Sequence, residues 1–161
     1  MIKPEGFDSA KESFDGFSSI PKGVYKFKIL RFENGFAKTN NAPRITAKVD
    51  IEEGNYAETF KEMSIERNKD LLLKVGYNIE GKGLNFLKGF LTSVERANIG
   101  FKFNWENDQQ IVGKHFYGYL SATEKWYEIS GIRSEKENVP EPKQREQTAQ
   151  NQQPASDDLP F

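Results

Sequence analysis

Alternation of apolar and polar residues predicts two strands near the start of the chain. In residues 24–32 every second position is apolar, and the pattern changes phase near Leu30. A β-bulge, which inserts one extra residue into a strand, produces such a change. Residues 44–52 alternate without interruption. We therefore expect two strands joined by a loop over residues 33–43, which is rich in Asn and Gly.

The middle of the chain carries turn and helix patterns. The Glu-Gly-Asn sequence at 53–55 is typical of a hairpin turn, and residues 56–65 predict a third, less regular strand. Asn68 is a suitable N-cap for a short helix that would end at Gly76. Leucines recur at helical spacing in residues 84–98, which predicts an amphipathic helix.

The last part of the patterned region predicts further strands. Residues 101–105 indicate a short strand, and residues 116–122 and 126–133 predict a hairpin with a turn near 123–125. The order strand, strand, strand, helix, strand hairpin is that of an OB-fold, a five-stranded Greek-key barrel with a helix between its third and fourth strands. We expect a mainly β protein of this class.

Composition divides the chain into three parts. Residues 1–20 predict a loose N-terminal extension, and residues 21–133 the folded domain. In residues 134–161, Gln, Glu, Pro, Asn and Ser dominate, so this tail lacks the apolar surface to order itself and is expected to be disordered. Of the 23 basic and 24 acidic residues, the tail holds three and six, so residues 1–133 carry 20 and 18. The small basic excess can serve binding only if it is gathered on one face.

Rings and cations on the outward sides of the predicted strands indicate a groove for single-stranded nucleic acid. Stacking of a base on an aromatic ring contributes about 1–3 kcal/mol and tolerates any sequence, while cations hold phosphates. The candidate residues are Lys26, Lys28, Phe36, Lys38, Arg44, Lys48, Trp105, Tyr117, Tyr119 and Trp126. Two other interpretations stay open: the lysines form solvated strand faces, and the rings pack under the N-terminal extension or against a partner in a homodimer.

The last five residues combine negative charge with apolar side chains. Pro160 restricts its own φ and favours an extended Leu159, so this tip is partly preorganised. A partner can capture such a segment in an apolar pocket beside Lys or Arg side chains. We therefore predict a protein-interaction tip made of Asp157, Asp158, Leu159, Pro160 and Phe161.

The tip resembles the C-terminal tip of bacterial and phage single-stranded-DNA-binding proteins, in which an acidic run precedes Leu/Ile-Pro-Phe. Three segments of the body resemble small phage members of that group: residues 21–25 (Pro-Lys-Gly-Val-Tyr), 88–97 and 111–114 (Ile-Val-Gly-Lys). The resemblance implies an OB-fold, sequence-independent binding of single-stranded DNA, and recruitment of replication, recombination and repair proteins through the tip. The tip has only two Asp residues instead of a longer run, which implies weaker capture by a partner.

Enzymatic chemistry finds little support in the sequence. The absence of cysteine excludes disulfides, thiolate metal sites and Cys nucleophiles. His115 is the only histidine, and no phosphate-binding glycine loop is present, so neither an enzyme nor a cofactor is expected. Asp50, Glu52 and Glu53 beside Lys61 leave a Mg²⁺-dependent nuclease as a lesser alternative, although Asp50 and Glu52 are expected to face solvent. The main alternative is a protein–protein adaptor that binds no nucleic acid.

The distribution of apolar residues also bears on location. The first residues contain no apolar segment of the kind found in secretion signals, and no long apolar run occurs elsewhere. We therefore expect a cytoplasmic protein without membrane contacts, in the host cytoplasm if a phage encodes it.

Overall fold

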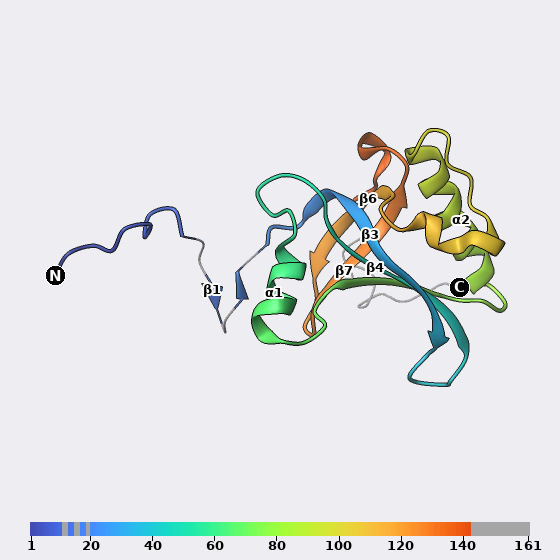
Figure 1. The fold of residues 1–161 in the computed structure, drawn as a ribbon, viewed down its shortest axis with the longest axis horizontal. Coiled ribbons are helices and arrows are strands. Elements are labelled where there is room, and N and C mark those ends of the chain that lie inside the picture. The colour runs from blue at the N-terminus through green and yellow to red at the C-terminus, as the bar shows by residue number, and fades with distance from the viewer. Residues whose placement is uncertain (11–12, 15–16, 19, 143–161) are drawn as a thin grey trace, which may run out of the picture.

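The body of the protein is a strongly curled antiparallel sheet of five strands (Figure 1). The parts of the chain that the computed structural model describes are residues 1–10, 13–14, 17–18 and 20–142. The strands lie in the order β5-β4-β3-β6-β7. Their bounds are β3 (Gly23–Phe36), β4 (Pro43–Ile51), β5 (Leu73–Asn78), β6 (His115–Ala122) and β7 (Tyr127–Arg133). The sheet curls until its edge strands β5 and β7 approach each other. Since the body consists mainly of this five-stranded sheet, the prediction of a mainly β fold is confirmed.

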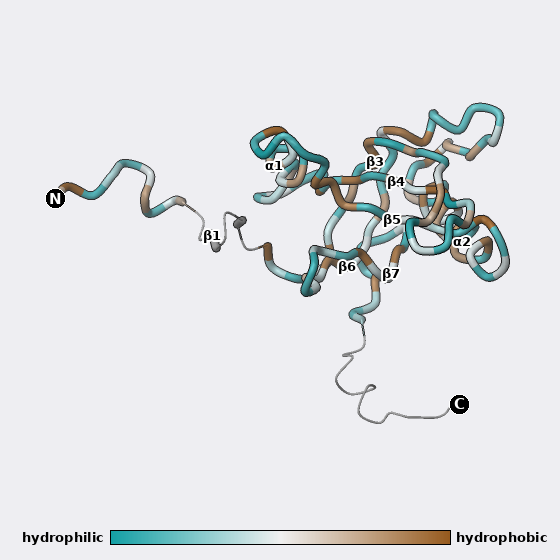
Figure 2. Tube along the Cα trace, turned by 90° about the horizontal axis from the view of Figure 1, so that it is seen from below, coloured by the Kyte–Doolittle hydropathy of each residue, from teal (hydrophilic) through white to brown (hydrophobic). Residues whose placement is uncertain are grey.

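Strand β3 is longer than its sequence pattern predicted. Its pairing with β4 skips Leu30, which confirms the bulge, and the change of register returns Phe32 to the core with 6% of its surface exposed. The strand continues to Phe36, so the loop predicted over residues 33–43 is shortened to residues 37–42. Figure 2 shows apolar segments (brown) interspersed with polar ones (teal) along the sheet, as one buried and one open face require.

Two neighbouring elements differ from the sequence predictions. Residues 56–65, predicted as the third strand, belong largely to helix α1 (Thr59–Arg67). The helix predicted to begin at Asn68 does not form, because Asn68 instead ends α1 in a left-handed conformation with φ of 54°. The third strand is β5, which comes later in the chain and covers residues that had been predicted as helical.

A contact from strand β4 explains where helix α1 begins. The carboxylate of Asp50, near the end of β4, accepts hydrogen bonds from the backbone N–H groups of Phe60 and Lys61 at 3.2 and 2.7 Å. These donors belong to the first helical turn, whose N–H groups have no hydrogen-bond acceptors within the helix. Only 2% of Asp50 is exposed, so the prediction that it faces solvent was wrong.

Helix α2 (Gly83–Ala97) confirms the amphipathic helix predicted over residues 84–98. Its buried side chains, Leu87, Phe90, Leu91 and Val94, face the sheet, and the helix packs against β5, β6 and β7. In Figure 1, α1 and α2 lie on opposite sides of the curled sheet.

The short strand predicted over residues 101–105 is absent from the structure. The N–H of Phe103 donates to the carboxylate of Glu95 on α2 at 2.8 Å instead of to a neighbouring strand. Asn104 then caps the 3-10 helix η1 (Trp105–Ile111) by accepting from the N–H of Glu106 at 2.8 Å.

The described N-terminal residues form little regular structure. Two-residue strands, β1 (Ser13–Phe14) and β2 (Phe17–Ser18), pair with each other, and residues 1–10 lie apart from the body (Figure 1). Ile20 joins the core with 5% of its surface exposed.

At the other end, the 3-10 helix η2 (Lys136–Asn138) follows β7. The predicted tip, residues 157–161, lies outside the described residues, as does the rest of 143–161. No helix in the described part of the chain has both the length and the apolar character that a membrane crossing needs.

Candidate functional site

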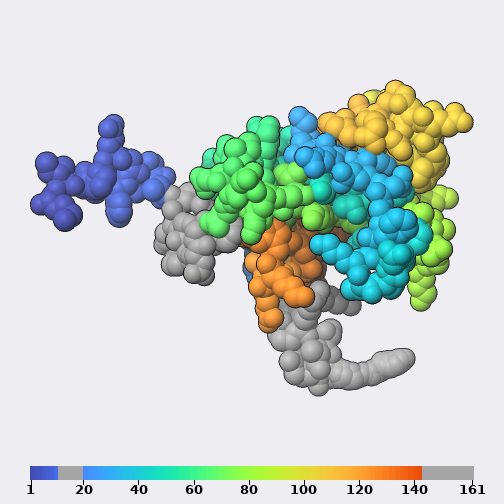
Figure 3. Space-filling view, turned by 60° about the horizontal axis from the view of Figure 1, so that its bottom comes forward, coloured from blue at the N-terminus to red at the C-terminus, as the bar shows by residue number. Residues whose placement is uncertain are grey.

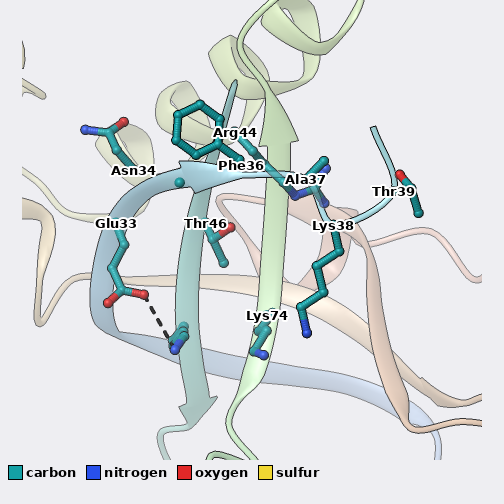
Figure 4. Close-up of a pocket in the computed structure, with 11 residues that line it drawn as sticks. Glu33, Asn34, Phe36, Ala37, Lys38, Thr39, Arg44, Thr46 and Lys74 are labelled. Carbon is teal, nitrogen blue, oxygen red and sulfur yellow. Dashed lines mark ion pairs between the residues drawn. The ribbon is translucent and has the colours of Figure 1, made fainter. Parts of the chain in front are cut away.

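A groove of about 540 Å³ lies on the outer face of strands β3, β4 and β5 (Figure 4). Its position follows from strand alternation: Ile45 and Ala47 of β4 are buried, so Thr46 between them faces outward. Thr46 lies opposite Gly76 of β5 in the register, and both residues are small. Thr46 therefore forms a low point of the groove floor, while Arg44 covers Gly76 and larger side chains rise around both.

Arg44 lies across strand β5 at one side of this groove. Its Nη1 donates a hydrogen bond to Oδ1 of Asn78 at 3.1 Å. A Cβ atom at Gly76 would lie 2.6 Å from both Nε and Nη2 of Arg44. Any side chain at position 76 would therefore displace the guanidinium group, so the glycine that the sequence suggested as a helix end serves to seat Arg44.

Lys48 also points into the groove, but two carboxylates neutralise it. Its Nζ lies 2.5 Å from Oδ2 of Asp70 and 3.5 Å from Oε1 of Glu33 (the latter drawn dashed in Figure 4). The hydrogen bond to Asp70 raises the pKa of Lys48. Burial favours a higher pKa for Asp70, but the hydrogen bonds from Lys48 and the backbone bring that pKa below its usual value. Lys48 is thus a shielded cation rather than a free one.

Lys38, Arg44 and Lys74 are cations of the groove without an ion-pair partner among the described residues. Of these, Lys38 and Lys74 are exposed. At the end of β3, Phe36 also contributes to the groove lining and has 66% of its surface exposed, but its ring stands on the other side of β3 from Lys38 and Lys74 (Figure 4). The groove therefore carries positive charge, and an exposed aromatic ring stands at its end.

A second groove of about 540 Å³ continues from the first, because Lys74 lines both. It leads to the β6–β7 hairpin and adds Lys69, Lys125 and Trp126. In Figure 3 the β3–β4 hairpin (blue to cyan) and the β6–β7 hairpin (orange) stand on either side of the chain's middle segment (green). The Trp126 ring packs edge-on against Phe60 at 5.9 Å, so only part of it faces the groove.

Three predicted site residues lie on a different part of the sheet. Lys26, Lys28 and Tyr117 occupy the outer side of the β3–β6 pair, where Lys26 lies opposite Tyr117 and Lys28 opposite His115. Lys26 is 3.6 Å from the carboxylate of Glu53. Burial, and then the charge of Lys26, lower the pKa of His115. This group is polar and partly paired, and it does not line the β3–β5 groove.

Two of the aromatic residues predicted for the site line neither of the two basic grooves. Tyr119 has only 8% of its surface exposed and offers no open face to a base. Trp105 is open, with 62% exposed, but it lies beside helix α2. The structure thus brings together Phe36, Lys38, Arg44 and Lys48, with Trp126 in the adjoining groove.

Lys69, Lys74 and Lys125 were missed as groove residues, and Gly76 was missed as the seat of Arg44. Lys74 and Gly76 were assigned to a helix, although the alternation Leu73-Lys74-Val75-Gly76 is a strand pattern of four residues. Such a short pattern does not distinguish a strand from a helix on its own.

Of the carboxylates considered for a metal-dependent nuclease, Asp50 has a structural role. Besides the two N–H groups of α1, Asp50 accepts from the N–H of Ile51 at 2.7 Å. Burial raises the pKa of Asp50, and the three backbone hydrogen bonds oppose that rise. Among the described residues, no three His, Asp or Glu side chains gather into a group that could hold a metal ion.

Comparison with known proteins identifies no family for the chain. No protein-family model matches it, and no curated protein matches it significantly. The chemistry of the grooves is therefore the basis on which a function can be assigned.

Proposed function

We propose that the protein binds single-stranded DNA without sequence preference along the groove of β3, β4 and β5. The observation that carries this proposal is the presence in one groove of three cations that form no ion pair within the described residues, Lys38, Arg44 and Lys74, with the exposed ring of Phe36 at its end. Phosphates would lie against the cations, and a base would stack on the ring. Stacking accepts every base, which accounts for binding without sequence preference.

The strand arrangement supports a further proposal, that the curled sheet is an OB-fold. The order β5-β4-β3-β6-β7, with α2 between the third and fourth strands of the sheet, fits a five-stranded Greek-key barrel. In that fold the second and third strands form the binding face, together with the loops that join strands 1–2 and 4–5. The corresponding parts here are β4, β5, the loop 37–42 and the turn before β7, and residues of each of them line the two connected grooves together with β3 and residues 69–72.

The tip, residues 157–161, completes the proposal. Two carboxylates followed by Leu159 and Phe161 suit capture by an apolar pocket with a basic rim. The bound DNA would thereby be connected to proteins of replication, recombination or repair.

Fluorescence of Trp126 tests DNA binding directly, because this residue lies in the groove that continues from the β3–β5 site. In a Trp105→Phe variant, Trp126 is the remaining tryptophan, and oligo-dT is expected to change its emission while duplex DNA has little effect. Binding should weaken with salt, with a slope of log K against log[salt] of about −0.7 for each phosphate neutralised.

The Trp126→Phe variant serves as the control, because its remaining tryptophan lies beside α2. A response to oligo-dT from this variant alone would contradict the assigned groove. If neither variant responded while both were folded, the adaptor hypothesis would be favoured.

Neutralising Asp70 is expected to strengthen DNA binding. The Asp70→Asn substitution removes the nearer of the two carboxylate charges beside Lys48, leaving Glu33, and keeps an oxygen to accept the N–H of Leu72, which bonds Oδ1 at 3.2 Å. An exposed ion pair contributes roughly 0.2–1 kcal/mol, which Lys48 would no longer lose when it binds a phosphate. This energy corresponds to a gain in affinity for oligo-dT of up to about fivefold. Oligo-dT titration at low salt measures it. Glu62→Gln changes charge equally on α1, away from the grooves, and an equal gain there would contradict a local effect.

A further inference from the structure

Trp105 helps to form an apolar groove that is separate from the basic one. Together with Phe103 it makes one wall, and helix α2 makes the other. The volume is about 370 Å³, within the range of small ligand sites. We call it the α2 groove; its main lining residues are Leu84, Leu87, Lys88, Leu91, Phe103 and Trp105. Leu84 has 49% of its surface exposed, so the apolar lining is open to a ligand.

Contacts behind the wall fix the α2 groove in its open shape. The N–H of Phe103 is held by Glu95 of α2 at 2.8 Å. The Phe103 ring packs edge-on against Phe32 of the core at 5.7 Å and against Trp105 at 4.8 Å. The position of Trp105 is therefore set before any ligand arrives, which lowers the entropic cost of binding.

Lys88 gives the α2 groove a cation with which a carboxylate of a ligand can pair. Lys88 is exposed and forms no ion pair within the described residues. The carboxylate of Glu95 also lines the groove and keeps its negative charge, with one oxygen accepting the Phe103 N–H, so the negative groups of a ligand are expected at Lys88 and not at Glu95. A matching ligand thus needs large apolar side chains next to negative charge.

We infer that the tip of the same chain, residues 157–161, docks in the α2 groove. Leu159 and Phe161 supply apolar side chains for the walls, and Asp157 and Asp158 supply negative charge for Lys88. A docked tip is withheld from other proteins, so a partner must displace it. The inference concerns the same tip as the proposed function, but it does not depend on DNA binding.

The chain is long enough for this contact. A Cβ atom at Gly131 of β7 would lie 2.9 Å from Pro140, so the described end of the chain lies against β7, which packs on α2. A helix with its side chains is about 10–12 Å across. The 14 residues from 143 to 156 can span up to about 50 Å. Such a tether gives an effective concentration on the order of millimolar, so even a weak contact is populated.

A labelled peptide with the sequence of residues 153–161 tests the inference by fluorescence anisotropy. The receptor is the full chain with Leu159→Ser and Phe161→Ser, called the tip variant, whose own tip cannot fill the groove. We expect the peptide to bind the tip variant, and to bind the unsubstituted chain at least about tenfold more weakly, because a tethered tip competes at millimolar effective concentration.

Further substitutions in the tip variant locate the contact. Trp105→Ala should weaken peptide binding about 30-fold, as loss of a buried aromatic anchor does. Lys88→Glu should weaken it about two- to fivefold, and a peptide with Lys at both Asp positions should recover the loss. Phe36→Ala is the matched control, because its ring is similarly exposed, 66% against 62% for Trp105. It should leave peptide affinity unchanged.

Several outcomes would overturn the inference. One is that the peptide does not bind, and another is that the tip variant and the unsubstituted chain bind it equally well. A third is that Phe36→Ala abolishes peptide binding while Trp105→Ala does not, which would place the tip in the basic groove. Sedimentation showing concentration-dependent association that the tip substitutions abolish would assign the contact to a second copy, against docking within one chain. Oligo-dT titration of the same variants reports separately on DNA binding, so its failure and the failure of tip docking are distinguishable.

Discussion

Replacing Phe60 with Ala is expected to lower the free energy of unfolding by about 3–5 kcal/mol. Phe60 is the one residue of α1 that is buried, with 0% of its surface exposed. Its ring packs edge-on against Tyr127 at 5.3 Å and Trp126 at 5.9 Å. The substitution would leave a cavity between the helix and the β6–β7 hairpin. Since small domains have total stabilities of about 5–15 kcal/mol, the loss would be a large share.

Urea denaturation followed by circular dichroism measures this effect. Ile65→Ala is the matched control, because Ile65 lies on the same helix with 71% of its surface exposed, and its change should stay within about 0.5 kcal/mol. If Phe60→Ala did not fold, Phe60→Leu would retain most of the apolar volume and show a smaller loss in the same direction. Similar small losses at positions 60 and 65 would contradict the packing of α1 against the hairpin.

Local patterns were sufficient to predict much of the sheet and the longer helix. The uninterrupted alternation before Ile51, the change of phase at Leu30 and the leucine spacing of α2 each involve neighbouring residues only. Alternation and helical spacing translate directly into buried faces. These elements were therefore predictable from the sequence, and with them the outward direction of Arg44 and Lys48.

Helix α1 and strand β5 were not predictable in the same way, because distant residues decide them. Helix α1 buries a single side chain, Phe60, and the backbone N–H groups of its first turn donate hydrogen bonds to Asp50 of strand β4. A helix with so little amphipathic pattern gives a weak sequence signal. Its misassignment moved the third strand, and Lys74 and Gly76 were lost from the predicted site.

The sequence also could not show which outward side chains remain free. Alternation placed Lys48 and Tyr119 on outer faces, but it does not tell what packs over them. Asp70 and Glu33 come from other segments to neutralise Lys48, and only 8% of the surface of Tyr119 is exposed. Free charge and free ring surface are properties of the tertiary structure, so a candidate site derived from one strand at a time includes both usable and covered residues.

Reversing the charges of Arg44 and Lys74 together is expected to lower affinity for oligo-dT by about 100-fold at low salt. Each contact between a cation and a phosphate contributes roughly 1.5 kcal/mol as a charge-assisted hydrogen bond, and two such losses give that factor. In the Arg44→Glu, Lys74→Glu variant the slope of log K against log[salt] should also become shallower by about 1.4, at 0.7 per lost phosphate contact. Titration at several salt concentrations measures both quantities.

The matched control is the Lys82→Glu, Lys136→Glu variant, which changes the net charge equally. Both lysines are exposed and lie outside the two basic grooves. Since the Debye length is about 10 Å at 0.1 M salt, their reversal should have a small effect at that salt concentration and leave the slope nearly unchanged. Equal losses in the two variants would mean that the protein attracts DNA through its overall charge. A loss confined to Arg44 and Lys74, in protein of unchanged urea stability, would assign the phosphates to the groove of β3, β4 and β5.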